Sequence, residues 1–462
     1  MGLRKEKDSL GEVFVPEEAY YGAQTARSMN FFSWGHEVMP EPIIHALALI
    51  KKCAALANRD LGLISERITD MIVSATDDVL SGQFKEHFPL KVWQTGSGTQ
   101  SNMNMNEVIS NLAIKRHGGI LGSKTPVHPN DHVNLSQSSN DVYPTAMHIA
   151  VVLETKKLLI PAIEKLKNAL KNKSLDFKFL IKIGRTHLMD AVPMTLGQEF
   201  SGYVDQIEKN LERIGFCLTG LYELAIGATA VGTGINVPKG FIEKILYYLS
   251  KETNEPFVRA SNYFSALSCH DALVFFHSAL VTLSCSLTKI ATDLAFLGSG
   301  PRCGFHELIF PENEPGSSIM PGKINPTQCE AVNMVCAQVM GNNQAVIMGG
   351  SRGNFELNVF KPVIAHNCLQ SITLLSDAMT SFAANFVFSL KANEKRLNEY
   401  VNSSLMLVTA LSPKIGYDNC SKIALKAFHD DLTLKEACLI LGFLSEEDFD
   451  ALTDPKSMVG NL

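Results

Sequence analysis

The 462-residue sequence has few charged residues and no segment typical of export. Charged residues make up 19% of the chain and hydrophobic residues 46%, a balance that excludes a disordered chain and predicts a large buried core. The formal net charge of −6 gives no general attraction for nucleic acid or anionic membranes. Basic residues near the start are not followed by an apolar run, so we expect neither a signal peptide nor a membrane anchor and predict a cytoplasmic protein.

Motifs for metals, nucleotides and redox chemistry are also missing. The ten cysteines include no Cys-x-x-Cys pair, which predicts reduced and mostly buried thiols; core packing is the favoured interpretation of Cys329 and Cys336. His306 and Glu307 open a zinc-protease pattern, but Phe310 stands where the second histidine is needed. Because no dinucleotide fingerprint or ligand cluster occurs, the sequence predicts no metal and no organic cofactor.

Three segments in the middle of the chain carry long hydrophobic stripes at helical spacing. The stripes are Leu273, Phe276, Leu280, Leu283, Leu287, Ile290, Leu294 and Leu297; Val204, Ile207, Leu211, Ile214, Leu218 and Leu221; and Cys368, Ile372, Leu375, Met379, Phe382 and Phe386. Gly298 follows the first stripe, as a glycine often follows a helix. This segment is long enough to span a membrane, but His277, Lys289 and Asp293 interrupt it and favour a helical bundle.

A fourth long helix is predicted after the Ser-Ser-Asn-Asp sequence, with Asn140 or Asp141 as its cap and Pro144 in its first turn. Its stripe comprises Ile149, Val152, Leu153, Leu159, Ile163, Leu166 and Leu170. Pro161 is expected to kink this helix. The thin charge on all these helices implies more apolar surface than one chain can hide, so we expect burial between subunits.

The predicted fold class is mainly α, with three domains. These are a mixed, mostly helical N-terminal domain (1–140), a central helical-bundle domain (141–395) and a small C-terminal helical domain (396–462). In the last domain Thr433 and Glu436 form a predicted capping box, and Ser445 with Asp448 offers a weaker one.

The stretch GSSIMPGKINPTQCE, residues 316–330, has the composition of an active-site loop. Its glycines permit unusual backbone angles and its prolines stiffen the path, so several backbone N–H groups can point at one anion. Ser317 and Ser318 would then meet a negatively charged ligand, near Lys323. The loop does not have the spacing of a nucleotide-binding P-loop, and Ile324 stands where that motif needs Ser or Thr.

Seven segments resemble, in the same order, the motifs of class II fumarases of the fumarase/aspartase superfamily. They are Val92–Val108, His128–His148, Gly184–Asp190, Gly227–Asn236, the loop at 316–330 with Gly353–Pro362, and Asn402–Leu411. The resemblance covers essentially the whole chain. It implies a hydro-lyase, a fumarate hydratase of the tricarboxylic acid cycle, which interconverts fumarate and L-malate by anti addition and elimination through an aci-carboxylate intermediate. It also implies a three-domain fold whose central long-helix bundles assemble into the multi-helix core of a homotetramer.

The resemblance further implies the roles of individual residues. Ser317 is the expected base, His187 the group that handles water, and Glu330 the residue that orients His187; a glycine-rich loop with Lys323 can stabilise the serine alkoxide that such a base needs. The expected substrate contacts are Ser97, Gly98, Thr99, Ser138, Ser139, Asn140, Thr186, Ser318, Lys323, Ile324 and Asn325. A second, peripheral dicarboxylate site is implied at His128, Pro129, Asn130 and Asp131, although this sequence also fits a turn with an Asx cap.

In the family the site gathers segments from three subunits, and we expect the TGSGT, QSSND and GSSIMPGK regions to come from different chains. Two other functions stay open: an aspartase or other amine-releasing lyase, which usually has glutamine where His187 stands, and a catalytically silent structural or binding homologue. TGSGT could equally be a plain turn, and Asn102, Asn104 and Asn106 could simply bridge helices. The sequence departs from common fumarase residues at Leu135, Met189, Tyr263 and Ser265.

Overall fold

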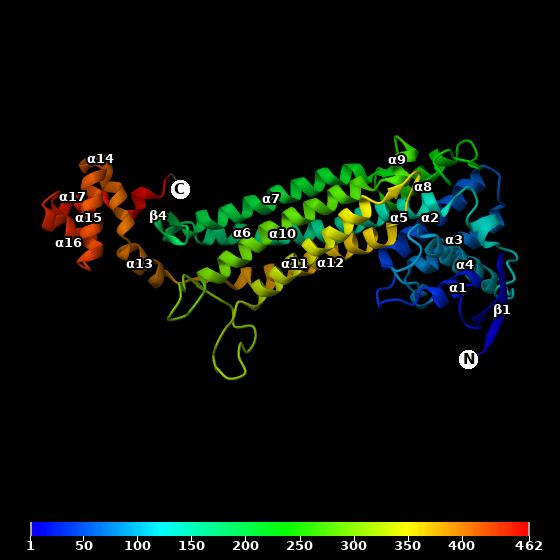
Figure 1. Ribbon diagram of the computed structural model, residues 1–462, viewed down its shortest axis with the longest axis horizontal. Helices are drawn as coiled ribbons and strands as arrows, with labels where there is room; N and C mark the ends of the chain where they lie inside the picture. The colour runs from blue at the N-terminus through cyan, green and yellow to red at the C-terminus, as the bar shows by residue number, and fades with distance from the viewer. Residues whose placement is uncertain (1, 461–462) are drawn as a thin grey trace. The chain divides into compact units, whose positions relative to one another are not determined.

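The computed structural model describes residues 2–460, and this part of the chain is mainly helical (Figure 1). It contains seventeen α-helices, while its ten short strands form five two-stranded pairs, so the predicted fold class is confirmed. The described chain divides into two compact units, one made of residues 2–161, 212–284 and 337–376 and the other of 162–211, 285–336 and 377–460. The three-domain division stays a prediction.

The first unit holds the shorter N-terminal helices. Its elements are β1 (Leu3–Asp8), β2 (Gly11–Pro16), α1 (Ala23–Phe31), α2 (Glu41–Asp60), α3 (Glu66–Leu80), α4 (Thr99–Arg116), α5 (Ser139–Glu154), β5 (Glu223–Leu224), α8 (Phe241–Thr253), β6 (Val258–Arg259), α9 (Tyr263–Ser268), β8 (Gly353–Asn354) and β9 (Leu357–Asn358). The β1–β2 and β8–β9 pairs are antiparallel, whereas β5 and β6 run parallel. The unit also contains a 3-10 turn at Lys85–His87 and π-helical turns at Pro129–Val133 and Thr155–Leu159.

The second unit holds the C-terminal helices and one longer hairpin. Its elements are α6 (Ile160–Asp176, from residue 162), β3 (Ile181–Thr186), β4 (Met189–Thr195), β7 (Leu308–Ile309), β10 (Lys391–Ala392), α13 (Glu394–Ser403), α14 (Ser412–Ile415), α15 (Tyr417–His429), α16 (Leu434–Leu441) and α17 (Glu446–Leu452), with 3-10 turns at Val387–Ser389, Leu405–Leu411 and Pro455–Met458. Four long helices contribute residues to both units: α7 (Leu196–Leu221), α10 (Asp271–Leu297), α11 (Thr327–Gly350) and α12 (Lys361–Asn385).

The predicted long helices are present, and their apolar stripes form much of the core. All eight stripe residues of α10 and all six of the third stripe are buried, the latter along α12 with Phe386 just beyond its end. His277, which interrupts the α10 stripe, is buried but hydrogen-bonded to Asn343 and Ser371. Among the helices of residues 2–460, α10 alone is long and apolar enough to cross a membrane, and half of its most apolar stretch is buried inside the protein.

Gly298 ends α10 for a packing reason. Its φ is not in the left-handed range, unlike that of Gly300. A Cβ at Gly298 would lie 2.0 Å from the Phe310 ring. The predicted glycine position is therefore correct, but close contact rather than backbone handedness requires it.

The predicted start of α5 was wrong by two residues. Ser138 is the N-cap, and Asp141 completes a capping box at the third helical position. Pro144 consequently lies inside the helix instead of in its first turn. At the other end, the π-helical turn at Thr155–Leu159 comes just before Pro161 and leads into α6, so the helix is interrupted where a kink was expected.

The C-terminal residues form a small helical cluster with its own core, which includes Leu411, Ile423 and Ala437. Thr433 and Glu436 form the predicted capping box at the start of α16. At α17 the Ser445 hydroxyl accepts a hydrogen bond from the Asp448 backbone N–H.

Candidate active site

His187 lies at the tip of the β3–β4 hairpin in the second unit. Thr186 pairs with Met189, so His187 and Leu188 are the two central residues of a tight turn. Both have positive φ (56° and 62°), the signature of a type I′ hairpin turn. Leu188 and Met189 are 72% and 69% exposed, and the His187 imidazole beside them is exposed as well. The imidazole is thus presented outward on a backbone whose conformation is closely defined.

A buried ion-pair cluster anchors the base of this hairpin. Arg185 and Lys182 on β3 both pair with Glu307, at 2.7 and 3.0 Å, and Lys182 also pairs with Glu199 on α7. Glu307 is fully buried, and the Arg185 guanidinium stacks on the Phe305 ring at 4.5 Å. Loss of Glu307 would leave the largely buried Arg185 guanidinium without its carboxylate partner, so the cluster fixes the strand that leads to His187.

The loop at 316–330 has the internal bonding expected of a defined turn. The Ser317 hydroxyl oxygen accepts hydrogen bonds from the backbone N–H groups of Ile319 (3.3 Å) and Met320 (3.0 Å), and Gly322 has a φ of 78°. The Asn325 amide donates to the Gly316 carbonyl, and a Cβ at Gly316 would lie 2.0 Å from the Lys323 carbonyl oxygen. Glycine is therefore required at position 316, where two backbone segments of the loop lie in close contact.

The polar groups of this loop differ in their exposure to solvent. Ser318 and Lys323 are exposed, whereas Ser317, Ile324 and Asn325 are partly buried. Glu330 is exposed in the first turn of α11. Within residues 2–460 no hydrogen bond or ion pair joins Glu330 to His187, so the expected orientation of His187 by Glu330 stays a prediction. Cys329 and Cys336 on α11 are both buried.

In the first unit, the TGSGT turn forms the N-terminal end of α4. The Ser97 and Thr99 hydroxyls are 2.8 Å apart, and Gly98 caps the helix with a φ of 79°. A Cβ at Gly98 would lie 2.3 Å from the Tyr143 ring on α5. TGSGT and QSSND are therefore adjacent within one chain, which corrects the expectation that they come from different chains.

The N-terminus of α5 presents three polar residues, Ser138, Ser139 and Asn140, beside this turn. The Asn102 amide on α4 donates to the Ser139 hydroxyl (3.1 Å), and the Asn140 amide donates to the carbonyl of Ala230 (2.8 Å). Helix N-termini attract anions because their first N–H groups are unpaired and the helix dipole is positive there. Two such ends, of α4 and α5, meet in this region.

Asp141 ties the start of α5 to the loop at 227–236, and sequence reasoning gave it only a capping role. Its carboxylate accepts backbone hydrogen bonds from Ser138, Gly227 and Thr229, at 2.9, 3.0 and 2.9 Å. Tyr263 supports the same loop by donating to the carbonyl of Ile226 at 2.7 Å. The partners of Asp141 at 227 and 229 lie so far along the chain that no local pattern could have revealed them.

Two fully buried lysines lie within electrostatic range of Asp141. Burial raises the pKa of Asp141 to about 6 and lowers the pKa of both Lys51 and Lys361 to about 7. Lys51 donates to the side chains of Asn134 (2.9 Å) and Gln137 (3.0 Å). The Lys361 ammonium has no hydrogen-bond partner among the described residues.

The asparagines of α4 bridge helices and turns, as the simpler interpretation expected. Asn102 and Asn106 both donate to the Asn134 side chain at 3.1 Å, and Asn104 donates to the carbonyl of His87 at 2.9 Å. All three are buried, so they support α4 from within.

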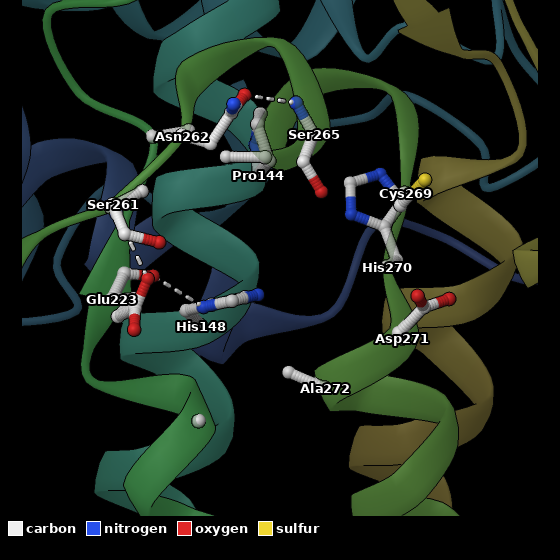
Figure 2. Close-up of a pocket in the computed structure, with 14 residues that line it drawn as sticks. Pro144, His148, Glu223, Ser261, Asn262, Ser265, Cys269, His270, Asp271 and Ala272 are labelled. Carbon is white, nitrogen blue, oxygen red and sulfur yellow. Dashed lines mark hydrogen bonds between the residues drawn. The ribbon is translucent and has the colours of Figure 1, made fainter.

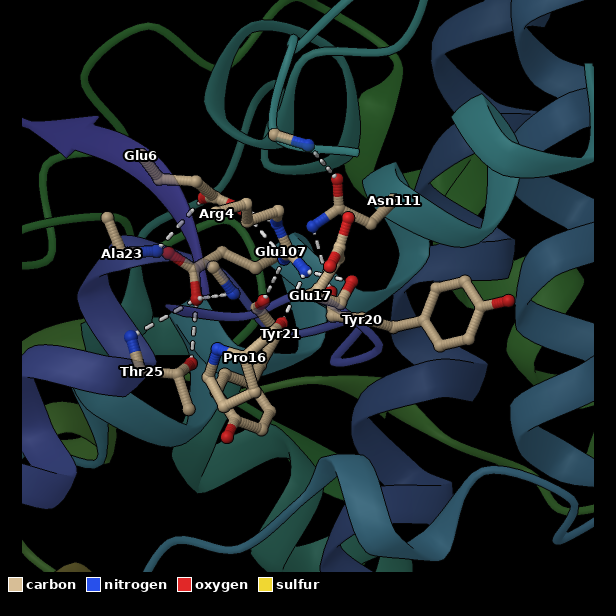
Figure 3. Close-up of polar contacts among 12 residues, drawn as sticks. Arg4, Glu6, Pro16, Glu17, Tyr20, Tyr21, Ala23, Thr25, Glu107 and Asn111 are labelled. Atoms are coloured by element: carbon tan, nitrogen blue, oxygen red, sulfur yellow. Dashed lines mark hydrogen bonds and ion pairs between the residues drawn. The ribbon is translucent and has the colours of Figure 1, made fainter. Parts of the chain in front are cut away.

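Glu107 anchors the middle of α4 to the start of α1 (Figure 3). Its carboxylate accepts from the backbone N–H groups of Gly22, Gln24 and Thr25 and from the Thr25 hydroxyl, at 2.7 to 3.1 Å. Burial raises the pKa of Glu107 despite these four donors. The helix that carries the TGSGT turn is thereby fixed along its length.

The predicted peripheral site forms a compact turn. The His128 ring nitrogen Nδ1 accepts from the backbone N–H groups of Asn130 and Asp131, both at 3.1 Å, so histidine caps the turn where an Asx residue was considered. Pro129 is buried, while Asn130 and Asp131 are exposed. A ligand-binding role for these residues stays a prediction.

A pocket of ≈170 Å³ opens beside α5, next to Pro144 and His148 (Figure 2). Glu223 and Asp271 contribute carboxyl groups to its lining, so the pocket is poorly suited to a dicarboxylate. Neither ring nitrogen of His270, another lining residue, has a hydrogen-bond partner among the described residues. No group of three or more His, Cys, Asp or Glu side chains in residues 2–460 is placed to hold a metal ion.

The residues that differ from those common in fumarases lie in different environments. Tyr263 has the structural role described above, and Arg259 stacks on its ring at 4.6 Å. Leu135 is partly buried and uses its carbonyl to accept from Asn58 and Gln137. Met189 and Ser265 are exposed, the former directly after the His187 turn.

Together, a mainly α fold with long helices, an outward imidazole and a serine-bearing glycine loop define a lyase of the fumarase type. The family model described as "Lyase" matches residues 11–341, and that described as "Fumarase C C-terminus" matches residues 407–460.

Curated relatives and solved structures agree with these matches. A fumarate hydratase class II from Chlamydia caviae is 69% identical over 99% of this chain and 100% of its own, and a mitochondrial fumarate hydratase from Homo sapiens is 57% identical over 99% and 90%. The crystal structure of a class II fumarase from Schistosoma mansoni superposes with a TM-score of 0.97 at 46% identity, covering 99% of each chain. The chain belongs to the class II fumarate hydratase family.

Proposed function

We propose that this chain catalyses the reversible hydration of fumarate to L-malate in the tricarboxylic acid cycle, as a cytoplasmic hydro-lyase. The observation that carries the proposal is the 69% identity, over essentially the full length, to a protein named fumarate hydratase class II. An exposed imidazole at His187 and an intact GSSIMPGK loop support it, because water addition needs an acid and a base on opposite faces of the double bond.

Ser317 is the proposed base that removes the proton beside a malate carboxylate. The negative charge then gathers on that carboxylate, so donors and positive charge must already be in place around it. Lys323, Asn325 and the backbone N–H groups of the loop are the proposed donors. His187, oriented by Glu330, protonates the departing hydroxyl or, in the reverse direction, takes a proton from the attacking water.

The substrate's carboxylates are proposed to bind at the N-termini of α4 and α5, through Ser97, Thr99, Ser139 and Asn140, with the hairpin residue Thr186. Hydroxyl and amide groups on fixed helix ends can orient a dianion without a large conformational cost. The proposed peripheral site at residues 128–131 would hold a second dicarboxylate.

The proposed active enzyme is a homotetramer with three domains per chain, and each active site takes residues from three subunits. The long helices expose large apolar side chains that another copy would cover; these include Phe216, Phe275, Phe296, Met334 and Met348. Light scattering after gel filtration should give four times the chain mass. A monomer that keeps full activity at high dilution would contradict this assembly.

The activity test follows the ultraviolet absorbance of the fumarate double bond after purified protein is mixed with malate, and separately with aspartate. We expect absorbance to grow with malate only. The Ser317→Ala variant should lose at least ~100-fold in kcat, the usual contribution of a positioned general base. An increase in absorbance with aspartate alone would identify an ammonia lyase instead. Full activity in Ser317→Ala would reject Ser317 as the base.

A further inference from the structure

Lys361, at the first position of α12, is a lysine whose burial needs an explanation. Its side chain is 0% exposed, and its ammonium donates to no described residue. Taking a charged amine out of water is costly unless it is paired, so such a residue is expected to interact with a nearby charge or a bound anion.

The backbone places Lys361 directly behind the TGSGT turn. Its N–H donates to the carbonyl of Gly96 at 3.1 Å. A Cβ at Gly96 would lie 1.3 Å from the carbonyl oxygen of Val359, so the two segments are in direct backbone contact. The backbone of Lys361 is therefore fixed against the turn that precedes α4, and its ammonium lies within electrostatic range of the buried Asp141 at the start of α5.

Four titratable groups interact electrostatically with Lys361, either directly or through one another. Asp141 attracts the Lys361 ammonium, and Lys51 interacts with the same carboxylate. His270 is repelled by Lys361, and His148 lines the same pocket as His270 (Figure 2). Burial keeps both imidazoles neutral at ordinary pH, since it lowers the pKa of His148 to about 4 and that of His270 well below its usual range. The charged set is thus one carboxylate and two ammonium groups.

The net charge of these groups affects how strongly the N-terminal end of α5 attracts an anion. A carboxylate in the first turn of α5 offsets the positive end of the helix dipole, which would weaken attraction for an anion at Ser138, Ser139 and Asn140. The Lys51 ammonium already donates hydrogen bonds to two amide side chains. The Lys361 ammonium has no hydrogen-bond partner among the described residues. With both lysines protonated, the buried set carries a net positive charge.

We propose that Lys361 is a positioning residue for dicarboxylate binding, which acts through Asp141 to hold the N-terminal turn of α5 in place and to keep this end of the first unit electropositive. The proposal rests on the proposed binding of the substrate's carboxylates at α4 and α5. It predicts that the protonated lysine favours substrate binding, and that substrate binding in turn favours the protonated lysine.

The test compares KM and kcat for fumarate at pH 6.5 and pH 8.5 in the full-length wild type, Lys361→Met and Lys361→Arg. At pH 6.5 the methionine variant should raise KM about tenfold, equivalent to ~1.4 kcal/mol, with kcat changed less than about threefold. The wild-type KM should rise towards the methionine value at pH 8.5, as the ammonium loses its proton. The KM of the arginine variant should rise less than that of the wild type, because its guanidinium stays charged while Lys51, which all three proteins share, still titrates.

Titratable groups that all three proteins share affect the three KM profiles in the same way. Differences between the profiles therefore report on residue 361. An unchanged KM in Lys361→Met, or a pH-dependent rise in Lys361→Arg equal to that of the wild type, would overturn the role of Lys361. If the methionine variant does not fold, the wild-type and arginine profiles decide alone. Absence of fumarate turnover by the wild type would overturn the proposed function as well, so the two failures are distinguishable.

Discussion

At the scale of single residues, Asp141 offers a direct test of how α5 is held. Asn at this position keeps one acceptor oxygen but points an amide group at backbone donors, so one of three hydrogen bonds is lost and a buried N–H is left unsatisfied. Asp141→Asn should lower the free energy of unfolding by ~1–3 kcal/mol in urea titrations. Asp70→Asn, on the exposed face of α3, is the matched control and should change it by less than about 0.5 kcal/mol.

The same residue shows what sequence patterns can and cannot reveal. The composition of the loop at 316–330 marks Ser317 as a candidate because its glycines, prolines and polar groups are contiguous. Asp141 and Glu307 have their decisive partners 86 to 125 residues away, so nothing near them in the sequence indicates their role. Glu307 drew attention only as part of a failed zinc motif.

At the scale of elements, the β3–β4 hairpin depends on its buried ion pairs. Glu307→Gln should destabilise the protein by ~3 kcal/mol, because Arg185 would be left buried without its carboxylate and Lys182 would keep only Glu199. The kcat for malate should also fall, since Arg185 leads directly into Thr186 and His187. Thermal denaturation and initial rates would measure both effects.

The exposed Glu312→Gln variant, five residues further along, carries the same charge change and serves as control. Equal stability of Glu307→Gln and Glu312→Gln would show that the cluster does not anchor the hairpin.

Elements were predictable where a regular period was present. The stripes of α7, α10 and α12 are long and regular enough to identify helices from spacing alone. Element ends were less predictable: Ser138 and Asn140 are both good caps, and only the fold decides that α5 starts at the earlier one. The positive φ at His187 and Leu188 carries no sequence signal, since neither residue is typical of such a turn.

At the scale of the whole molecule, Lys361 should make stability depend on pH. Burial lowers its pKa in the folded protein to about 7 from an ordinary value of 10.5, so between these values the unfolded chain binds the proton more tightly. The free energy of unfolding should therefore rise with pH across this window, by up to ~1.4 kcal/mol per pH unit, and the contribution should be constant below about pH 7.

Urea titrations of the wild type and Lys361→Met between pH 7 and pH 10 would measure this slope. Removal of the lysine should reduce this slope, because only Lys51 of the two buried lysines then titrates, so the wild type should gain stability relative to Lys361→Met as the pH rises. Parallel curves would mean that Lys361 keeps an ordinary affinity for its proton in the folded state.

The left-handed backbone at His187 has a consequence for natural and engineered variation at that position. Valine, isoleucine or threonine there would meet a steric penalty of ~1–2 kcal/mol in the turn itself, before any chemistry is considered. Asparagine tolerates this backbone and removes the imidazole, so His187→Asn isolates the loss of proton transfer. If a β-branched residue at position 187 abolishes activity, the cause can be backbone strain as well as the loss of the imidazole. Changes of catalytic function at this position are therefore restricted to the few side chains that tolerate a left-handed backbone.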